Sequence, residues 1–120
     1  MSPQRYLADT AAAAAAVNDF SAVLAEAGPV ASAAKLVALA PRLEAARART
    51  SSIADRLDAQ TLEDRRLEAQ REKAAAALDE VIVAMQLVTD AATAGKPVVA
   101  SEAAGRYATS VSSLRSLPAG

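Results

Sequence analysis

The sequence predicts an all-α protein, an antiparallel up-down four-helix bundle with a long central helical hairpin. A 53-residue stretch from Arg42 to Ala94 contains neither glycine nor proline. Alanine, the best helix former, accounts for 34 of the 120 residues. Apolar residues recur at spacings of three and four on both sides of position 60, as on one face of a helix. A chain of this length forms one domain, residues 1–120.

The first helix is expected over about residues 3–27. Ser2 is a good N-cap and Pro3 suits the first helical position. An apolar stripe then runs from Tyr6 through Phe20 to residue 27, where Gly28 followed by proline ends the helix.

The second and third helices are expected over about residues 30–60 and 62–94, with a turn near residue 60 between them. Thr61 is the expected N-cap of the third helix, and Leu62, off the stripe, is expected at an exposed tip. Pro41 marks a kink or the start of a fresh helix. Folding at the turn places one apolar stripe against the other, so that Leu36, Leu39 and Leu43 are expected to face Leu78, Val81 and Met85.

Two other arrangements of this segment stay open. A turn at Thr50-Ser51-Ser52 is one of them. The other is a single rod from Pro41 to Ala94, which would be about 80 Å long at ~1.5 Å per residue. A rod of that length needs a second chain along it to bury its apolar face.

The fourth helix is expected over about residues 101–117. Gly95-Lys96-Pro97 ends the third helix, Ser101 is the expected N-cap, and Pro118 closes the chain's last helix. Short connections make neighbouring helices antiparallel, so both termini are expected at one end of the bundle. Packing of the first helix on the last would bring Tyr6 close to Tyr107.

Composition excludes several classes of function. The chain has no cysteine and no histidine, which removes thiol and imidazole catalysis and most zinc sites. No serine lies in a G-x-S-x-G elbow, and Asp79 and Glu80 are expected on an outer face. We therefore expect no enzymatic activity, no cofactor and no metal. Aromatic residues make up only 2% of the chain, so the core is expected to be thin.

Charged residues are concentrated between Arg42 and Lys73, which hold 15 of the 27. One interpretation is a solvated helix surface with pairs three residues apart, at Glu44–Arg47, Glu63–Arg66 and Glu68–Arg71. The other is a surface that docks a protein partner or a second copy, through Arg56, Arg65, Arg66 and Arg71. The net charge of −1, interleaved acids and absence of aromatic residues between the arginines argue against nucleic acid.

Tyr6-Leu7-Ala8-Asp9-Thr10-Ala11 leads into an alanine-rich helix. In this segment and in its alanine-rich, histidine-free composition, the chain resembles the mature part of actinobacterial lipoproteins and anchored envelope proteins. The resemblance implies an extracytoplasmic, cell-envelope location, with membrane attachment only through an anchor outside this sequence. It supplies no functional residue. Small type VII secretion substrates are a poorer match, because the Trp-x-Gly turn and the Tyr-x-x-x-Asp/Glu signal are absent.

The expected function is therefore that of a non-enzymatic extracytoplasmic helical interaction or structural domain. No signal peptide and no transmembrane helix is visible in the sequence. One alternative is a bundle that binds a small apolar molecule between alanine-lined helices. Another is a cytoplasmic helical adaptor or structural protein that dimerises through the charged segment.

Overall fold

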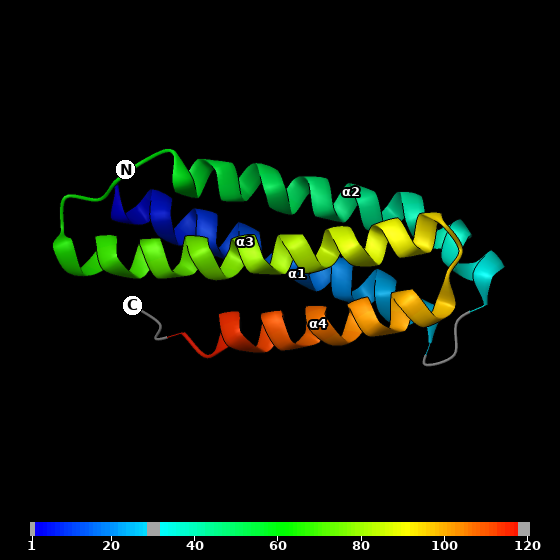
Figure 1. Cartoon of the computed structure of the whole chain (residues 1–120). Helices are drawn as coiled ribbons and strands as arrows, with labels where there is room; N and C mark the ends of the chain where they lie inside the picture. Colours follow the sequence, from blue (N-terminus) through cyan, green and yellow to red (C-terminus); the bar gives the residue numbers. More distant parts are fainter. Residues whose placement is uncertain (1, 29–31, 118–120) are drawn as a thin grey trace.

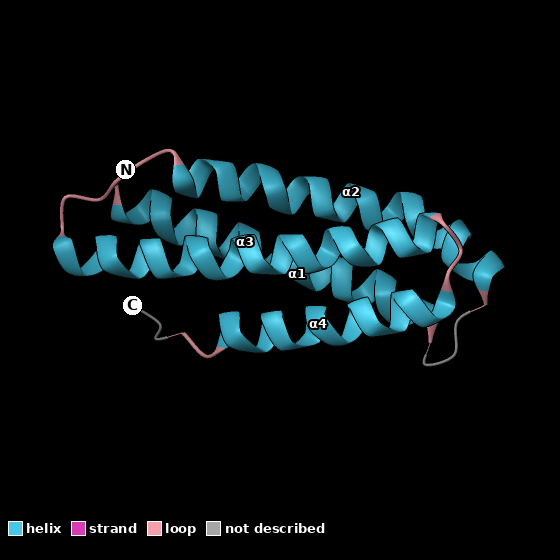
Figure 2. Cartoon of the chain, in the orientation of Figure 1, coloured by secondary structure: helices cyan, strands magenta, loops and turns pink. Residues whose placement is uncertain are grey.

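The protein is a bundle of four helices in up-down order (Figure 1). The computed structural model describes residues 2–28 and 32–117. The helices are α1 (Pro3–Ala27), α2 (Ala33–Asp58), α3 (Arg65–Thr93) and α4 (Pro97–Arg115). They make up 88% of the described residues, which contain no strand, and short loops join them (Figure 2). The predicted all-α four-helix bundle is confirmed, and α1 begins at the end of the bundle where α4 finishes (Figure 1).

The two ends of α1 follow the expected local chemistry. The Ser2 hydroxyl accepts a hydrogen bond from the Arg5 backbone N–H at 3.1 Å, and Pro3 occupies the first turn. Gly28 adopts φ 74°, a conformation that costs glycine no steric strain. At α2, Ser32 caps in the same way and the helix begins at Ala33; the expected start at residue 30 lies outside the described residues.

The long central segment folds as a hairpin of α2 and α3, so neither the single rod nor a turn at residues 50–52 forms. Pro41 neither breaks α2 nor starts it, because the helix continues through it. Proline removes the hydrogen bond to the carbonyl of Val37, four residues earlier. Val37 is 50% exposed, so water can reach this part of the helix.

The loop between α2 and α3 differs from the prediction in two ways. The N-cap of α3 is Asp64 rather than Thr61, because the Asp64 carboxylate accepts from the backbone N–H groups of both Arg66 and Leu67. Leu62 is buried in the core rather than exposed at a tip. Its backbone N–H donates to Glu68 Oε2 at 2.7 Å, which holds the loop against the first turn of α3.

The fourth helix begins at Pro97, four residues before the expected start, and ends at Arg115. Gly95, at φ 64°, reverses the chain in a tight turn in which the Lys96 N–H bonds to the Ala91 carbonyl. Proline suits the first helical turn because its φ is preset and no partner for its N–H is needed there. Ser101 therefore lies inside α4 and is not its cap.

The core follows the predicted stripes of α2 and α3. All six residues expected to face one another are buried: Leu36, Leu39, Leu43, Leu78, Val81 and Met85. The expected approach of Tyr6 to Tyr107 is wrong. Tyr107 reaches α1 at Val17, and Tyr6 lies eleven residues earlier, about 16 Å away along the helix at ~1.5 Å per residue. Tyr107 instead packs on Phe20, with ring centroids 4.9 Å apart.

The four seams of the bundle are packed unequally. Helix α3 packs closely on α2 and on α4, and α2 packs closely on α1, whereas α1 and α4 approach each other much less closely. Across residues 2–28 and 32–117, no helix is long and apolar enough to span a membrane. The α1–α4 seam is therefore the side on which the bundle is least closed.

Candidate functional site

The open seam forms a groove with a volume of about 460 Å³. We call it the α1–α4 groove. Short apolar side chains form its walls, two buried leucines form its floor, and three polar side chains stand at its rim. The principal lining residues are Ala13, Ala14 and Val17 of α1, Val111 and Leu114 of α4, Leu57 and Leu78 on the floor, and Thr10, Asn18 and Arg115 at the rim.

Two features of the sequence keep this groove open. Residues 11–16 are six consecutive alanines, whose single methyl groups leave space that a larger side chain would fill. Helix α4 has 19 residues against 29 in α3, so it covers only part of the length of its neighbour. The groove therefore lies where α1 presents methyl groups and α4 comes to its end.

Tyr107 joins the two helices on one side of the groove. Its hydroxyl donates to the Val17 carbonyl at 3.0 Å and lies 2.6 Å from the Ser21 hydroxyl. Burial raises the pKa of the Tyr107 phenol, so this group stays neutral and keeps its proton for the Val17 carbonyl. A long aromatic side chain thus spans a gap that the two backbones do not close.

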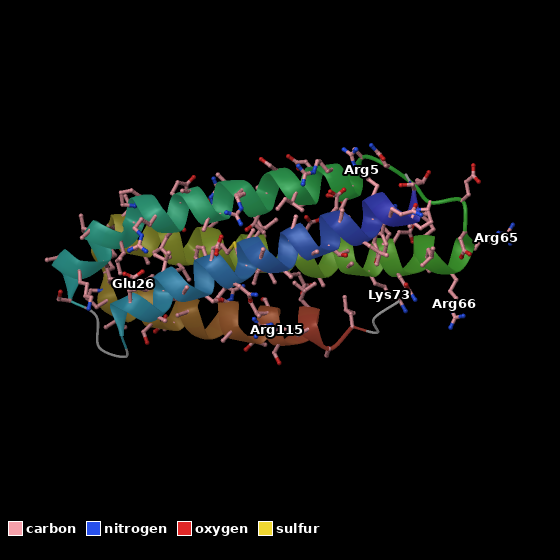
Figure 3. The ribbon with its side chains drawn as sticks, turned by 180° about the vertical axis from the view of Figure 1, so that it is seen from behind. Arg5, Glu26, Arg65, Arg66, Lys73 and Arg115 are labelled. Atoms are coloured by element: carbon pink, nitrogen blue, oxygen red, sulfur yellow. The ribbon has the colours of Figure 1, made fainter. Side chains whose placement is uncertain are left out.

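Arg115 is the charged group of the groove. Its Nη2 donates to Asn18 Oδ1 at 2.9 Å, across the seam. Within the described part of the chain Arg115 forms no ion pair. Figure 3 shows the bundle from the side of α1, with Arg115 on the neighbouring α4. A cation bonded only to a neutral amide at an apolar groove retains its capacity to attract an anion.

The carboxylates of α1 are all directed to another seam. Each pairs with an arginine of α2, at distances of 2.6, 2.8 and 3.4 Å: Glu26–Arg42, Asp19–Arg49 and Asp9–Arg56. The order of these partners follows the antiparallel course of α1 and α2. The α1–α2 seam is therefore closed by opposite charges, and α1 has no further carboxylate to offer to α4.

The predicted arginine surface is only partly assembled. Arg71 does not belong to it, because its side chain is buried at 7% exposure. Its Nη1 donates to the Leu57 carbonyl at 2.6 Å, and its other nitrogens bond to the Glu68 carboxylate. This arrangement fastens α3 to the last turn of α2. Arg71 is a structural clamp and is not available to a partner.

The other three arginines remain on the surface. Arg56 pairs with Asp9, so its charge is already partly compensated. Arg65 and Arg66 are exposed at the start of α3 and form no ion pair with a described residue (Figure 3). The expected Glu63–Arg66 pair is absent because Glu63 lies in the loop before α3. The expected pairs Glu44–Arg47 and Glu68–Arg71 are confirmed.

Sequence reasoning missed Asp9. Its side chain is 7% exposed, and its Oδ2 atom is buried without a hydrogen-bond partner in the described structure. Its spacing in the sequence could have indicated this burial. Asp9 follows Tyr6 by three positions and precedes Ala13 by four, which places it on the buried stripe. The next residue, Thr10, lies at the rim of the groove.

No metal site was found among residues 2–28 and 32–117, where no group of three or more carboxylates converges. Asp79 and Glu80 are exposed, as expected from the stripe. Partial desolvation of its carboxyl group, with the nearby charges of Asp58 and Asp55, raises the pKa of Asp79. Asp90 is also exposed and accepts a hydrogen bond from the Gln86 amide at 2.7 Å.

Comparison with known proteins gives no match: no family model fits the chain, and no curated protein or solved structure is significantly similar to it. The resemblance to actinobacterial envelope proteins stays a prediction, as do the extracytoplasmic location and the lack of enzymatic activity. The α1–α4 groove and the exposed charges are the features from which a function can be inferred.

Proposed function

We propose that this protein is a non-enzymatic helical binding domain that holds a small apolar ligand in the α1–α4 groove. The groove itself is the observation that carries the proposal. Its volume of about 460 Å³ lies within the range of roughly 300–1,000 Å³ usual for ligand sites. Its apolar walls with a few polar groups at the rim also have the composition of such sites.

Packing physics supports a ligand at this position. Protein interiors are filled as densely as organic crystals, because each missing neighbour forfeits dispersion attraction. Leu57 and Leu78 on the floor are each 1% exposed, so the deepest part of the groove has little contact with water. An apolar molecule in the groove would supply the contacts that α4 does not make with α1.

A second candidate is docking of an acidic protein partner at the start of α3. Arg65 and Arg66 support it, because both are exposed and neither is neutralised by an ion pair with a described residue. Two neighbouring cations form a smaller surface than the four arginines predicted from the sequence. The groove is therefore the better supported site.

Titration with toluene, a neutral apolar probe, tests the proposal. We expect saturable shifts of the Val111 and Leu114 methyl signals in NMR spectra, with little change at Val83 and Leu87 on an outer face of α3. Ala14→Leu should weaken binding by filling the groove. Ala15→Leu is the matched control, because Ala15 is also exposed on α1 but does not line the groove. Absence of saturable shifts, or equal effects of the two variants, would refute the proposal.

A further inference from the structure

Two hollows lie along the α1–α4 seam, and Arg115 borders both of them. On one side of it lies the apolar groove, walled by alanine, valine and leucine. On the other side lies a second, shallower hollow, whose lining includes the hydroxyl-bearing residues Ser21, Tyr107 and Ser112. Arg115 and Val111 border both hollows. The apolar groove thus adjoins a hollow that carries hydroxyl groups among its apolar residues, and a guanidinium group lies where the two meet.

The charge at this boundary is positive and uncompensated by the two helices that form the seam. All three carboxylates of α1 pair with α2. The only carboxylate of α4 belongs to Glu102, thirteen residues before Arg115 and therefore about 20 Å away along the helix. Asn18, the neutral partner of Arg115, also carries an amide NH2 group that donates no hydrogen bond to a described residue. Two donors therefore meet at the polar end of the groove, where an anion can accept from both.

The length of the groove limits the apolar part of the ligand. Its lining on α1 runs from Thr10 to Asn18, and the eight steps between them span about 12 Å at ~1.5 Å each. An extended chain of single bonds advances about 1.2 Å per bond, one third of the ~3.6 Å span of a residue. A linear chain of about ten carbons therefore fits between the rim at Asn18 and the far end at Thr10.

We infer that the α1–α4 groove binds a single-chain carboxylate of about ten carbons, with the alkyl chain against Ala14, Val111 and Leu114 and the carboxylate against Arg115 and Asn18. This inference rests on the proposed function, which it narrows from an apolar ligand to an anionic amphiphile. Arginine suits this position because its planar guanidinium group matches a carboxylate and tolerates partial exposure.

The test compares decanoate with 1-decanol, which carries the same chain without the charge. Both are titrated below their aggregation concentrations at pH 7.5, and the methyl signals of Val111 and Leu114 report binding. The wild-type chain is expected to bind decanoate about tenfold more tightly than decanol, the scale of one charge-assisted hydrogen bond at a partly exposed site. Higher salt should reduce this ratio.

Two variants test whether Arg115 and Asn18 cause the preference for decanoate, and a third variant is the control. Arg115→Gln should bring the decanoate-to-decanol ratio close to one. Asn18→Asp should do the same while keeping the shape of the side chain, because the new carboxylate neutralises Arg115 and repels decanoate. Arg106→Gln is the matched control, since Arg106 is exposed on α4 and does not line the groove. Circular dichroism of each variant verifies that the bundle is folded.

A wild-type ratio near one, or a ratio that survives both Arg115→Gln and Asn18→Asp, would overturn the inference. If toluene and decanol bind in the groove and decanoate binds no better, the proposed function stands and only the carboxylate assignment fails. If none of the three compounds binds, both fail. A tenfold ratio that is lost in both rim variants and kept in Arg106→Gln would establish the carboxylate site.

Discussion

Tyr107 shows how a single side chain substitutes for close helix packing. Its ring packs against Phe20 with the two planes tilted by 50°, and its hydroxyl bonds to the Val17 carbonyl and the Ser21 hydroxyl of α1. Tyr107→Phe keeps the ring contact and removes both hydrogen bonds. We expect a loss of about 1–2 kcal/mol in the free energy of unfolding, measured by urea denaturation. Ser21→Ala should cost less, because the bond to Val17 remains; a larger loss for Ser21→Ala would contradict this account.

Glu68 gives the structure an acid-sensitive contact. Its bonds to Arg71 and to the Leu62 backbone N–H lower the pKa of the carboxyl from 4.5 to about 2. A lowered pKa means that the folded state holds its proton less tightly than the unfolded chain does. The stabilisation is therefore fully present above pH 4.5 and is lost as the pH falls toward 2.

Glu68→Gln tests this dependence. The variant should melt at a lower temperature than the wild type at pH 7, because the Arg71 guanidinium loses its carboxylate partner. The difference should shrink as the pH falls from 4.5 to 2, since the wild-type carboxyl becomes protonated there. Glu80→Gln, at an exposed position without an ion pair to a described residue, is the control. A gap between Glu68→Gln and wild type that is independent of pH would show that Glu68 does not act through its charge.

At the scale of elements, the loop between α2 and α3 is part of the core and not only a connection. Leu62 is 6% exposed and packs in the apolar cluster, while its backbone N–H is held by Glu68. Leu62→Ala should therefore destabilise the protein by about 2–5 kcal/mol, the range for buried leucines. Leu7→Ala, at a position 61% exposed, should change the free energy of unfolding by no more than about 0.5 kcal/mol. If thermal unfolding shows equally small losses of stability for Leu62→Ala and Leu7→Ala, the loop does not pack as described.

Ion pairs between two helices organise the α1–α2 seam. The spacing of charges within a single helix does not reveal such pairs. Three arginines of α2 meet three carboxylates of α1, and two of these pairs are exposed on both sides. Exposed ion pairs contribute at most about 1 kcal/mol each to the free energy of unfolding. Their main effect is therefore to fix the register of α1 against α2. By using every acid of α1, they leave the opposite seam with a cation and no counter-charge.

At the scale of the whole molecule, the elongated shape of 49 × 22 × 17 Å follows from folding the long central segment back on itself. Spin labels at positions 47 and 73 test this topology. A continuous helix would separate them by about 39 Å, at ~1.5 Å for each of 26 steps. In the hairpin, position 47 lies eleven residues before the end of α2 and position 73 eight residues after the start of α3, so the intramolecular distance should be much shorter. A distance near 39 Å by pulsed electron paramagnetic resonance would contradict the hairpin.

Much of the architecture was predictable from local chemistry alone. Proline and glycine set the backbone conformation at their own positions. Pro3 and Gly28 therefore mark the ends of α1 whatever the helix packs against. Periodicity on one helix likewise identified Leu36 and Leu78 as core residues before any neighbour was known. The start of α4 was missed because Ser101 is a good cap by type, while Gly95 and Pro97 already reverse the chain and begin the helix.

The four helices and the approximate position of the hairpin turn follow from the amino-acid sequence, because each depends on residues close together in the chain. The burial of Arg71, the pairing of Asp9 with Arg56 and the groove between α1 and α4 became visible only in the folded structure. These features depend on how far each helix is rotated and shifted against another. Asn18 and Arg115 are separated by 97 positions, and no local pattern specifies that they meet.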